Sequence, residues 1–242
     1  MSVEQSKEAN EMLLNTARGL RERGYNVVWS HVGDDALFNE ELLSICNYCY
    51  LHGRPHTGNE TKDALSMARQ IGNQIKESMT HALAWNPRAI VYMEGDKSSF
   101  VPYIERIAQP ILKDEADLAV ATRSWDEFHA FPKVQQFWEG LFNLYAGFRA
   151  GFKTDWIYGP KAFTQETGSF MLDYKASDFG VIVHPLAAAL KKGKRVVGVN
   201  VAGFPQDNYM KKYNDINFLK HFAWRMMSFW TNVKGLHSGL RS

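Results

Sequence analysis

Residues 89 to 97 have the sequence Ala-Ile-Val-Tyr-Met-Glu-Gly-Asp-Lys, an apolar run that ends abruptly in two acids. A short apolar run bounded by polar residues is typical of a buried strand. Side chains two positions apart in an extended chain point to the same side, so Glu94 and Asp96 can bind one divalent cation and, through it, a diphosphate. A solvated turn is the alternative, because acids beside a glycine are common in loops after strands.

The length and composition fit one folded domain and exclude several classes of protein. The chain has 242 residues, of which 45% are hydrophobic and 22% are charged. No apolar run approaches the about eighteen residues that span a membrane. The formal net charge of +2 is too small to predict nucleic-acid binding. The polar and acidic start, MSVEQSKEANEM, is unlike a secretory signal and favours a cytoplasmic protein.

The apolar period switches repeatedly between that of helices and that of strands. This alternation predicts a mainly parallel sheet covered by helices on both faces. Ligands bind such sheets at the carboxyl ends of the strands, where Glu94 and Asp96 lie. In chain order, the predicted elements are helix 4–23 ended by Gly24, strand 26–32, helix 38–51, helix 62–84, strand 89–93, helix 100–112, strand 117–122, helix 135–148, a helix within 178–192, strand 195–201 and helix 217–230.

The two cysteines, Cys46 and Cys49, lie within the predicted helix 38–51. Their spacing puts them on one helical face, and no second pair is present to complete a zinc site. Buried free thiols are therefore the expected state.

Several common catalytic motifs are absent from the chain. It contains no G-x-G-x-x-G, no G-x-x-x-x-G-K-[ST] and no G-x-S-x-G. These absences argue against a usual dehydrogenase, a P-loop kinase and a serine hydrolase of the nucleophile-elbow type. The remaining interpretation of the acidic pair is a site that binds a nucleotide through a metal ion.

Seven segments occur in a fixed order: GN and SMTHA within 72–82, VYMEGD at 91–96, FVPYI at 100–104, ADLAVATR at 116–123, FNLY at 142–145, DWIYGPKAF at 155–163, and KGKRV at 192–196 after the alanines of 187–189. In order and spacing they resemble the GT-A fold of family 2 glycosyltransferases, the group that includes dolichyl-phosphate mannose synthases. The resemblance covers a little over half of the chain.

This resemblance implies a GT-A-like three-layer sandwich over residues 1–205, followed by a loop and an aromatic amphipathic helix over 206–242. It also implies transfer of a sugar from a UDP- or GDP-linked donor to an acceptor hydroxyl. Mg²⁺ or Mn²⁺ at Glu94 and Asp96 would stabilise the leaving diphosphate as a Lewis acid.

The chain departs from the family pattern in two ways. The family's first strand, which carries nucleobase contacts, has no counterpart before the helix that starts near Glu4, and the metal motif is Glu-Gly-Asp in place of Asp-x-Asp. A catalytically silent GT-A-like binding or assembly protein is therefore the alternative function. A nucleotidyltransferase is a third possible function. Such an enzyme usually needs a glycine-rich loop near its N-terminus, and the sequence shows none there.

Four residues are candidates for binding the nucleotide. Asp34 and Asp35 follow the strand where the family has acids near the nucleoside, although capping of the next helix explains them equally well. Arg123 can direct its guanidinium at phosphate, or it can be an exposed charge at a strand end. Lys97 can help to neutralise the diphosphate, with a solvated lysine as the alternative.

The catalytic base is predicted among acids of the acceptor-side segments. Asp178, followed by Phe-Gly, is preferred over Asp173, with helix capping as the structural alternative for Asp178. The resemblance implies that Asp155 orients the acceptor. His184 is a candidate third metal ligand, and the alternative is a core histidine.

The C-terminal helix predicted at 217–230 is aromatic and basic. Phe218, Phe222, Met226 and Phe229 recur at helical spacing. Packing on the domain, a homodimer contact and peripheral binding to a membrane surface are the three uses that fit this pattern.

Overall fold

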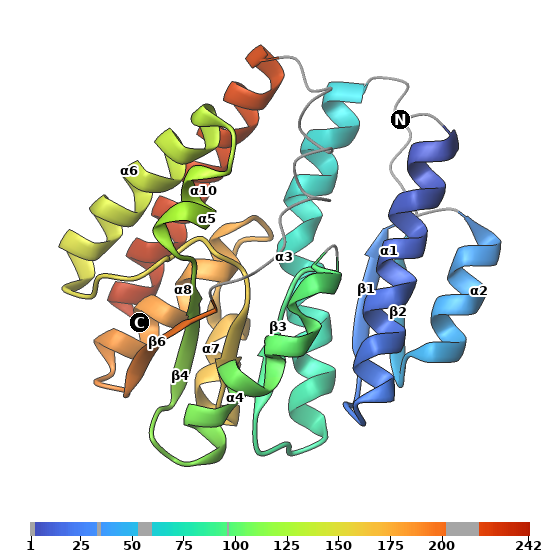
Figure 1. Ribbon diagram of the computed structural model, residues 1–242. Helices are drawn as coiled ribbons and strands as arrows, with labels where there is room; N and C mark the ends of the chain where they lie inside the picture. The colour runs from blue at the N-terminus through green and yellow to red at the C-terminus, as the bar shows by residue number, and fades with distance from the viewer. Residues whose placement is uncertain (1–2, 33–34, 53–59, 96, 202–217) are drawn as a thin grey trace.

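Helices and strands alternate along the computed structural model, which describes residues 3–32, 35–52, 60–95, 97–201 and 218–242 (Figure 1). In chain order, the elements are α1 (Val3–Glu22), β1 (Val28–Val32), α2 (Ala36–Ile45), β2 (Tyr48–His52), α3 (Glu60–Ala84), β3 (Ile90–Tyr92), the 3-10 helix η1 (Ser98–Tyr103), α4 (Ile104–Leu112), β4 (Leu118–Thr122), α5 (Trp125–His129), α6 (Lys133–Ala150), β5 (Lys161–Phe163), α7 (Gln165–Asp173), α8 (Gly180–Lys191), β6 (Val196–Asn200) and α10 (Phe218–Arg241).

The described strands form two sheets. β1 and β2 pair in parallel, and the second sheet has the strand order β3-β5-β4-β6. β4 and β6 are parallel, whereas β5 is antiparallel to both β3 and β4. β3, β4 and β6 therefore run in one direction, as the predicted α/β class requires, and β5 is the exception to the mainly parallel sheet.

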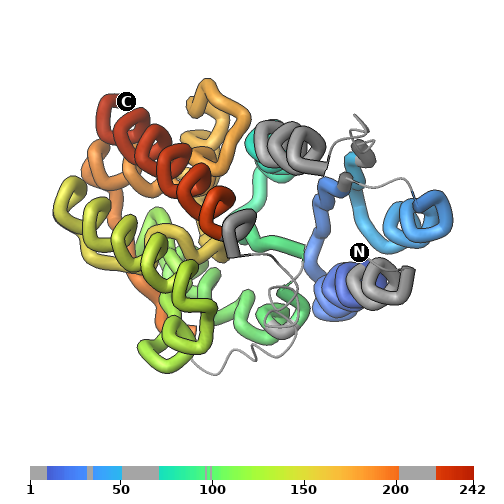
Figure 2. Tube along the Cα trace, turned by 90° about the horizontal axis from the view of Figure 1, so that it is seen from above, coloured from blue at the N-terminus to red at the C-terminus, as the bar shows by residue number. Residues whose placement is uncertain are grey.

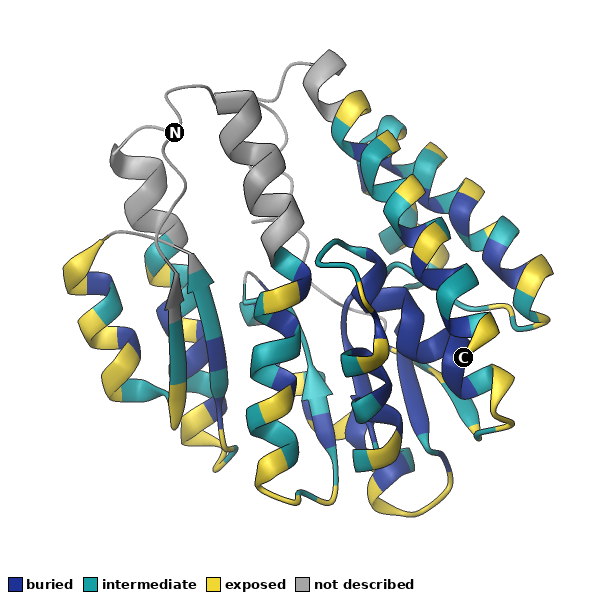
Figure 3. Ribbon diagram, turned by 180° about the vertical axis from the view of Figure 1, so that it is seen from behind, coloured by how far each residue is buried: buried dark blue, intermediate teal, exposed yellow. Residues whose placement is uncertain are grey.

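Alternate residues of the strands pack on opposite faces of the sheet. Leu118 and Val120 of β4 belong to a core with α3, α6, α7, α8 and α10. Ala119 and Ala121 belong to a second core with α1, α2, η1 and α4. This alternation follows from the two-residue period of a strand. Helices thus cover both faces of the sheet, which makes three layers (Figure 2). The central strands β4 and β5 are almost entirely buried, whereas the edge strands β3 and β6 are partly exposed (Figure 3).

Most of the long periodic elements occur within a few residues of their predicted positions. The predicted helix 4–23 corresponds to α1, and Gly24 beyond it has a φ of 79°. Only glycine adopts this left-handed conformation without strain, which explains why the helix ends there.

The predicted helix over 38–51 is wrong in its second half. α2 ends at Ile45, and Tyr48–His52 form β2, which pairs with β1. Asn47 causes the break: its Oδ1 accepts a hydrogen bond of 2.7 Å from the backbone nitrogen of Val27, and its own nitrogen donates to the Val27 carbonyl at 3.0 Å. These two bonds hold the chain at the start of β1 and align the next residues beside it.

The two cysteines consequently do not share a helical face. Cys46 is the C-cap of α2, and Cys49 lies in β2. Both are free thiols and are partly buried. Burial raises the pKa of Cys46 to about 12 and that of Cys49 to about 11, so both stay protonated at neutral pH.

Three elements were not predicted: β5, α5 and α7, which have 3, 5 and 9 residues. Runs this short contain too few periods to stand out from the surrounding sequence. β5 enters the sheet from the opposite end because α6 and the segment after it return the chain to the edge at which β4 ended.

The C-terminal helix is longer than predicted and packs on the sandwich. α10 extends from Phe218 to Arg241 and contacts α8 and α6. Glycines bring α10 and α8 into backbone contact. A Cβ at Gly235 would overlap the backbone of Gly180, and a Cβ at Gly239 would overlap the carbonyl of His184.

We expect Gly235→Ala to destabilise the protein by about 1–3 kcal/mol, because the added methyl group forces the two helices apart. Gly140→Ala in α6 is the matched control, since its Cβ would meet only Phe128, at 3.7 Å. The control should be neutral or stabilising by up to about 1 kcal/mol. Urea denaturation followed by circular dichroism measures both changes. Equal losses in the two variants would contradict the close packing of α8 and α10.

Candidate active site at the carboxyl edge of the sheet

Three charged side chains meet at one edge of the four-stranded sheet. Glu94 follows β3 by two residues, Arg123 directly follows β4, and Lys161 is the first residue of β5. Lys161 pairs with Tyr92 of β3 and with Val120 of β4. Because β5 is antiparallel, its first residue lies at the edge where β3 and β4 end. This is the edge at which open α/β sheets bind ligands.

Glu94 packs directly against the backbone of Gly159. A Cβ at Gly159 would displace the Glu94 carboxylate from its present position. The Nζ of Lys97 lies 3.3 Å from Oε2 of Glu94 and 5.8 Å from the centroid of the Tyr158 ring. Lys97 is only 6% exposed, so the solvated lysine considered from the sequence is wrong. Its ammonium therefore lies near both a carboxylate and an aromatic ring.

Lys161 lies beneath this ion pair and is fully buried. Its Nζ donates hydrogen bonds to the carbonyls of Tyr158 and Gly159, at 2.8 and 3.4 Å. Burial lowers the pKa of Lys161 to about 8, although the negative charges of Glu94 and Asp155 act in the opposite direction. Lys161 therefore changes charge at a pH close to neutrality.

Arg123 is bound internally. Its Nε donates to Oδ2 of Asp155 at 2.6 Å, and its Nη2 donates to Oε2 of Glu139 at 2.8 Å. The guanidinium also lies 4.9 Å from the Phe131 ring centroid and 5.0 Å from that of Tyr158. The Arg123 side chain is 2% exposed, so the alternative prediction of an exposed charge at the strand end is wrong. The predicted contact with phosphate would require Arg123 to leave two carboxylates.

Asp155 is the central anion of this cluster. Its Oδ1 accepts from Nη2 of Arg123 at 2.9 Å and from Nδ2 of Asn143 at 3.1 Å. Burial favours the protonated form, but the charge and hydrogen bonds of Arg123 outweigh it and lower the pKa of Asp155. Asp155 is thus ionised and engaged by the protein itself.

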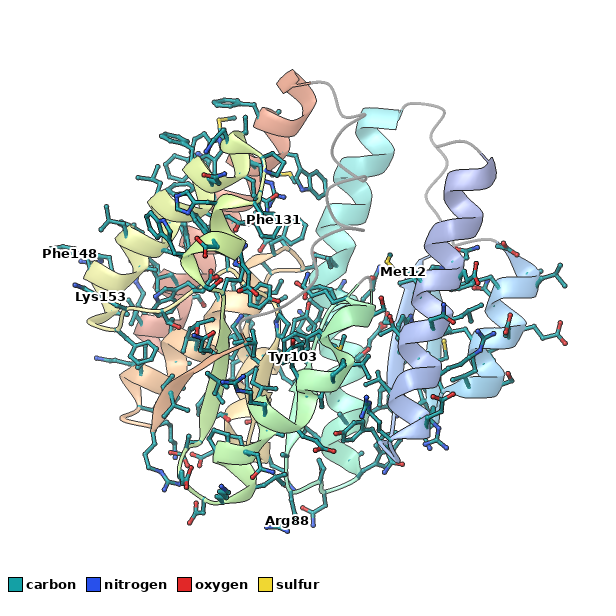
Figure 4. All side chains as sticks on the ribbon, viewed as in Figure 1. Met12, Arg88, Tyr103, Phe131, Phe148 and Lys153 are labelled. Atoms are coloured by element: carbon teal, nitrogen blue, oxygen red, sulfur yellow. The ribbon has the colours of Figure 1, made fainter. Side chains whose placement is uncertain are left out.

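The cluster extends into α10 through residues that the sequence analysis missed. Oε1 of Glu139 accepts from Nη1 of Arg225 at 3.1 Å and from Nε2 of Gln135 at 2.7 Å. The sequence contained one signal for this extension of the cluster: Gln135 and Glu139 are two polar residues four positions apart within an aromatic helix. Figure 4 labels Phe131, one of the rings that lie beside Arg123.

The other predicted acids are not part of this cluster among the described contacts. Asp178 accepts hydrogen bonds from the Tyr174 hydroxyl at 2.7 Å and from the Gly180 nitrogen at 3.0 Å, at the start of α8. Asp173 is exposed at the end of α7. Asp35 caps α2, because its Oδ1 accepts from the Phe38 nitrogen at 3.2 Å.

His184 is a core residue of α8. It is 1% exposed, and its ring centroid lies 5.3 Å from that of Tyr174. Burial lowers the pKa of His184, which keeps the ring neutral at neutral pH. The structure places it among core side chains, but neither ring nitrogen has a hydrogen-bond partner among the described residues, so it is not the satisfied core histidine of the alternative.

Of the predicted metal pair, only Glu94 lies among the described residues. Its Oε2 is buried and accepts no hydrogen bond from them, and the Lys97 ammonium is 3.3 Å away. Asp96 and Asp34 lie outside the described residues. Within the part of the chain that the structure describes, no three His, Cys, Asp or Glu side chains lie close enough to hold a metal ion.

Comparison with known proteins identifies the fold. No protein-family model and no curated protein matches the chain. Among solved structures, it is similar to glucosyl-3-phosphoglycerate synthase from Mycobacterium tuberculosis in complex with Mn²⁺, UDP and phosphoglyceric acid, with a TM-score of 0.58 and 12% identity over 94% of this chain and 75% of that one. A second structure of that synthase has a TM-score of 0.54 and 13% identity, over 95% and 76% of the two chains.

These similarities confirm a GT-A-like fold over nearly the whole chain. They do not single out dolichyl-phosphate mannose synthases, so that finer part of the resemblance is not supported. The first described element is α1. β1 and β3 also belong to different sheets.

We expect Arg123→Met to destabilise the protein by about 3–5 kcal/mol, because it leaves Asp155 and Glu139 buried without their partner. Arg195→Met is the matched control. Arg195 also binds two carboxylates, those of Asp114 and Asp117, but its side chain is 49% exposed. The control should lose much less stability than Arg123→Met in a urea denaturation series, because solvent screens an exposed ion pair. A small loss for Arg123→Met would show that the buried cluster does not stabilise the fold.

Lys161 should make stability depend on pH. Its pKa is about 8 in the fold and 10.5 in an unperturbed lysine. The unfolded chain therefore binds more protons between these values, so burial of Lys161 costs stability below pH 8 and this cost disappears as the pH rises. Lys161→Met removes the dependence.

The wild type should consequently gain roughly 3 kcal/mol relative to Lys161→Met between about pH 7.5 and about pH 10.5. Urea denaturation of both proteins at the two pH values measures this difference. Lys113→Met, at an exposed position after α4, is the control and should show no such gain. A difference that is independent of pH would contradict the lowered pKa.

Proposed function

We propose that this protein is a glycosyltransferase that moves a sugar from a UDP- or GDP-linked donor to an acceptor hydroxyl. The observation that carries the proposal is a GT-A-like fold whose charged side chains gather at the carboxyl ends of β3 and β4. One of the similar structures, a synthase that acts on phosphoglycerate according to its name, holds UDP and Mn²⁺.

The proposed donor site is built around Glu94 and Lys97. Breaking the bond between sugar and diphosphate leaves negative charge on the diphosphate, and fixed positive charge at that point lowers the barrier. Lys97 is already held by Glu94 and Tyr158, so its ammonium needs little reorganisation. A divalent cation, Mg²⁺ or Mn²⁺, held by Glu94 and Asp96 would add Lewis-acid stabilisation of the leaving group.

Arg123 has a positioning role in this proposal. Through Asp155 it fixes the segment that leads to Tyr158 and Gly159, the residues against which Lys97 and Glu94 pack. Asp155 therefore acts on the acceptor side through the backbone that it anchors. An ionised acid paired with a buried arginine is a poor proton acceptor, because protonation would break the pair.

Asp178 is the proposed base that takes the proton of the acceptor hydroxyl. It lies in the partly buried loop before α8, and no described residue forms an ion pair with it. Its two hydrogen-bond donors, the Tyr174 hydroxyl and the Gly180 nitrogen, hold the carboxylate in one orientation. Fixed orientation is what a general base requires.

The alternative is a catalytically silent GT-A-like binding or assembly protein. The internal pairing of Arg123 favours it, because this removes one cation that was predicted to contact phosphate. β1 and β3 belong to different sheets, and this division also favours the silent protein. A silent protein of this kind would keep the fold without binding a nucleotide sugar.

Calorimetric titration with UDP and with GDP, each with and without Mn²⁺, separates the two functions. The transferase should bind one nucleotide in a metal-dependent way, and Glu94→Gln and Asp96→Ala should each weaken binding at least about tenfold. Glu115→Gln is the control, because Glu115 is exposed before β4, at the opposite edge of the sheet. If neither nucleotide binds at millimolar concentration, the silent function replaces the proposed one.

A further inference from the structure

The outward face of α6 is apolar along its length. Phe137, Leu141, Leu144 and Phe148 are 59%, 40%, 74% and 84% exposed. Their spacing of three or four residues places them on one face of the helix. In Figure 4, Phe148 projects outward from α6. Such a face is normally turned toward a core, so its exposure indicates a contact outside the described chain.

A second apolar stripe lies on α10. Phe222, Met226 and Trp230 are 38%, 40% and 58% exposed and follow one another at intervals of four residues. The opposite side of α10 packs on α8 through Gly235 and Gly239. The exposed stripe is therefore not the face that attaches this helix to the sandwich.

The two stripes open to the same side. The ring centroids of Trp138 and Phe222 are 5.4 Å apart, and the Tyr145 hydroxyl lies 2.6 Å from Nε2 of His237. Contacts thus advance together along both helices, which run side by side in the same direction (Figures 1 and 2). Successive residues of a helix are about 100° apart around its axis. On each helix, this spacing places the exposed stripe beside the residues that contact the other helix, on the side turned away from the core. Together they form one surface, the α6/α10 face.

Cationic side chains outnumber acidic ones around the α6/α10 face, where Asp173 is an acid that lies close to Trp230, Lys234 and Arg241. Lys133 and Arg149 of α6, and Lys234 and Arg241 of α10, are exposed. α10 contains no acidic residue, and Glu139, the only acid in α6, is 5% exposed and paired with arginines. An apolar centre with a mainly cationic rim favours an anionic partner.

We propose that the α6/α10 face binds the surface of an anionic lipid membrane. Aromatic and aliphatic side chains would enter the boundary between headgroups and acyl chains, and the lysines and arginines would contact the anionic headgroups. A second copy of the chain would bring two cationic rims together, which opposes self-association. Within the part of the chain that the structure describes, none of the helices has the length and hydropathy of a membrane span.

Co-sedimentation with lipid vesicles tests this proposal and does not require sugar transfer. The full chain should sediment with vesicles that contain phosphatidylglycerol and not with vesicles of phosphatidylcholine alone. High salt should weaken the binding, because it screens the cationic rim. Leu144→Glu/Phe148→Glu should reduce the bound fraction at least about tenfold, because two charges enter the apolar boundary.

Leu37→Glu is the matched control, since Leu37 is 80% exposed on α2, outside this face, and its replacement should leave binding unchanged. Urea denaturation midpoints close to that of the wild type establish that the variants fold. Failure of the wild type to bind anionic vesicles, or equal binding by Leu144→Glu/Phe148→Glu, would overturn the proposal. A dimer seen by analytical ultracentrifugation that only the double variant abolishes, without vesicle binding, would instead assign the face to a second copy.

Discussion

The buried guanidinium of Arg123 is the interaction on which the edge of the sheet depends. A charge removed from water is tolerated only when partners surround it, and here Asp155 and Glu139 neutralise it while aromatic rings close the remaining sides. These partners come from different parts of the chain. One cation therefore connects the end of β4 with the segment before β5 and with α6, and Arg225 continues the connection to α10.

This internal use of Arg123 determines which charges remain for a ligand. The resemblance to sugar transferases would direct an arginine at the diphosphate, but in this fold the arginine holds the wall of the site. The charge at the edge comes from Glu94 and Lys97, which lie against Gly159 and Tyr158. Lys161 lies below them, and its lowered pKa reflects the same lack of water that stabilises the pairs around it.

α6 has an unusual distribution of side chains for a surface helix. Its buried side includes Gln135 and Glu139, whereas Phe137, Leu144 and Phe148 face outward. Periodicity correctly predicted a helix here, because apolar residues recur at helical spacing. It did not reveal which side is buried, since polar residues can be buried when a network satisfies them. The position of Arg225 on α10 decides this, and Arg225 is 86 residues from Glu139 in the chain.

The sequence by itself determined the alternating α/β order, the ends of the long helices and the strand that leads to Glu94, because these depend on local period and on residues such as Gly24. It also carried the resemblance to the GT-A fold, which the solved structures confirm. Only the tertiary structure decided that Tyr48–His52 form a strand, that β5 runs antiparallel and that Arg123 is sealed inside the protein. Each of these depends on partners that are distant in the chain, and local propensity does not specify such partners.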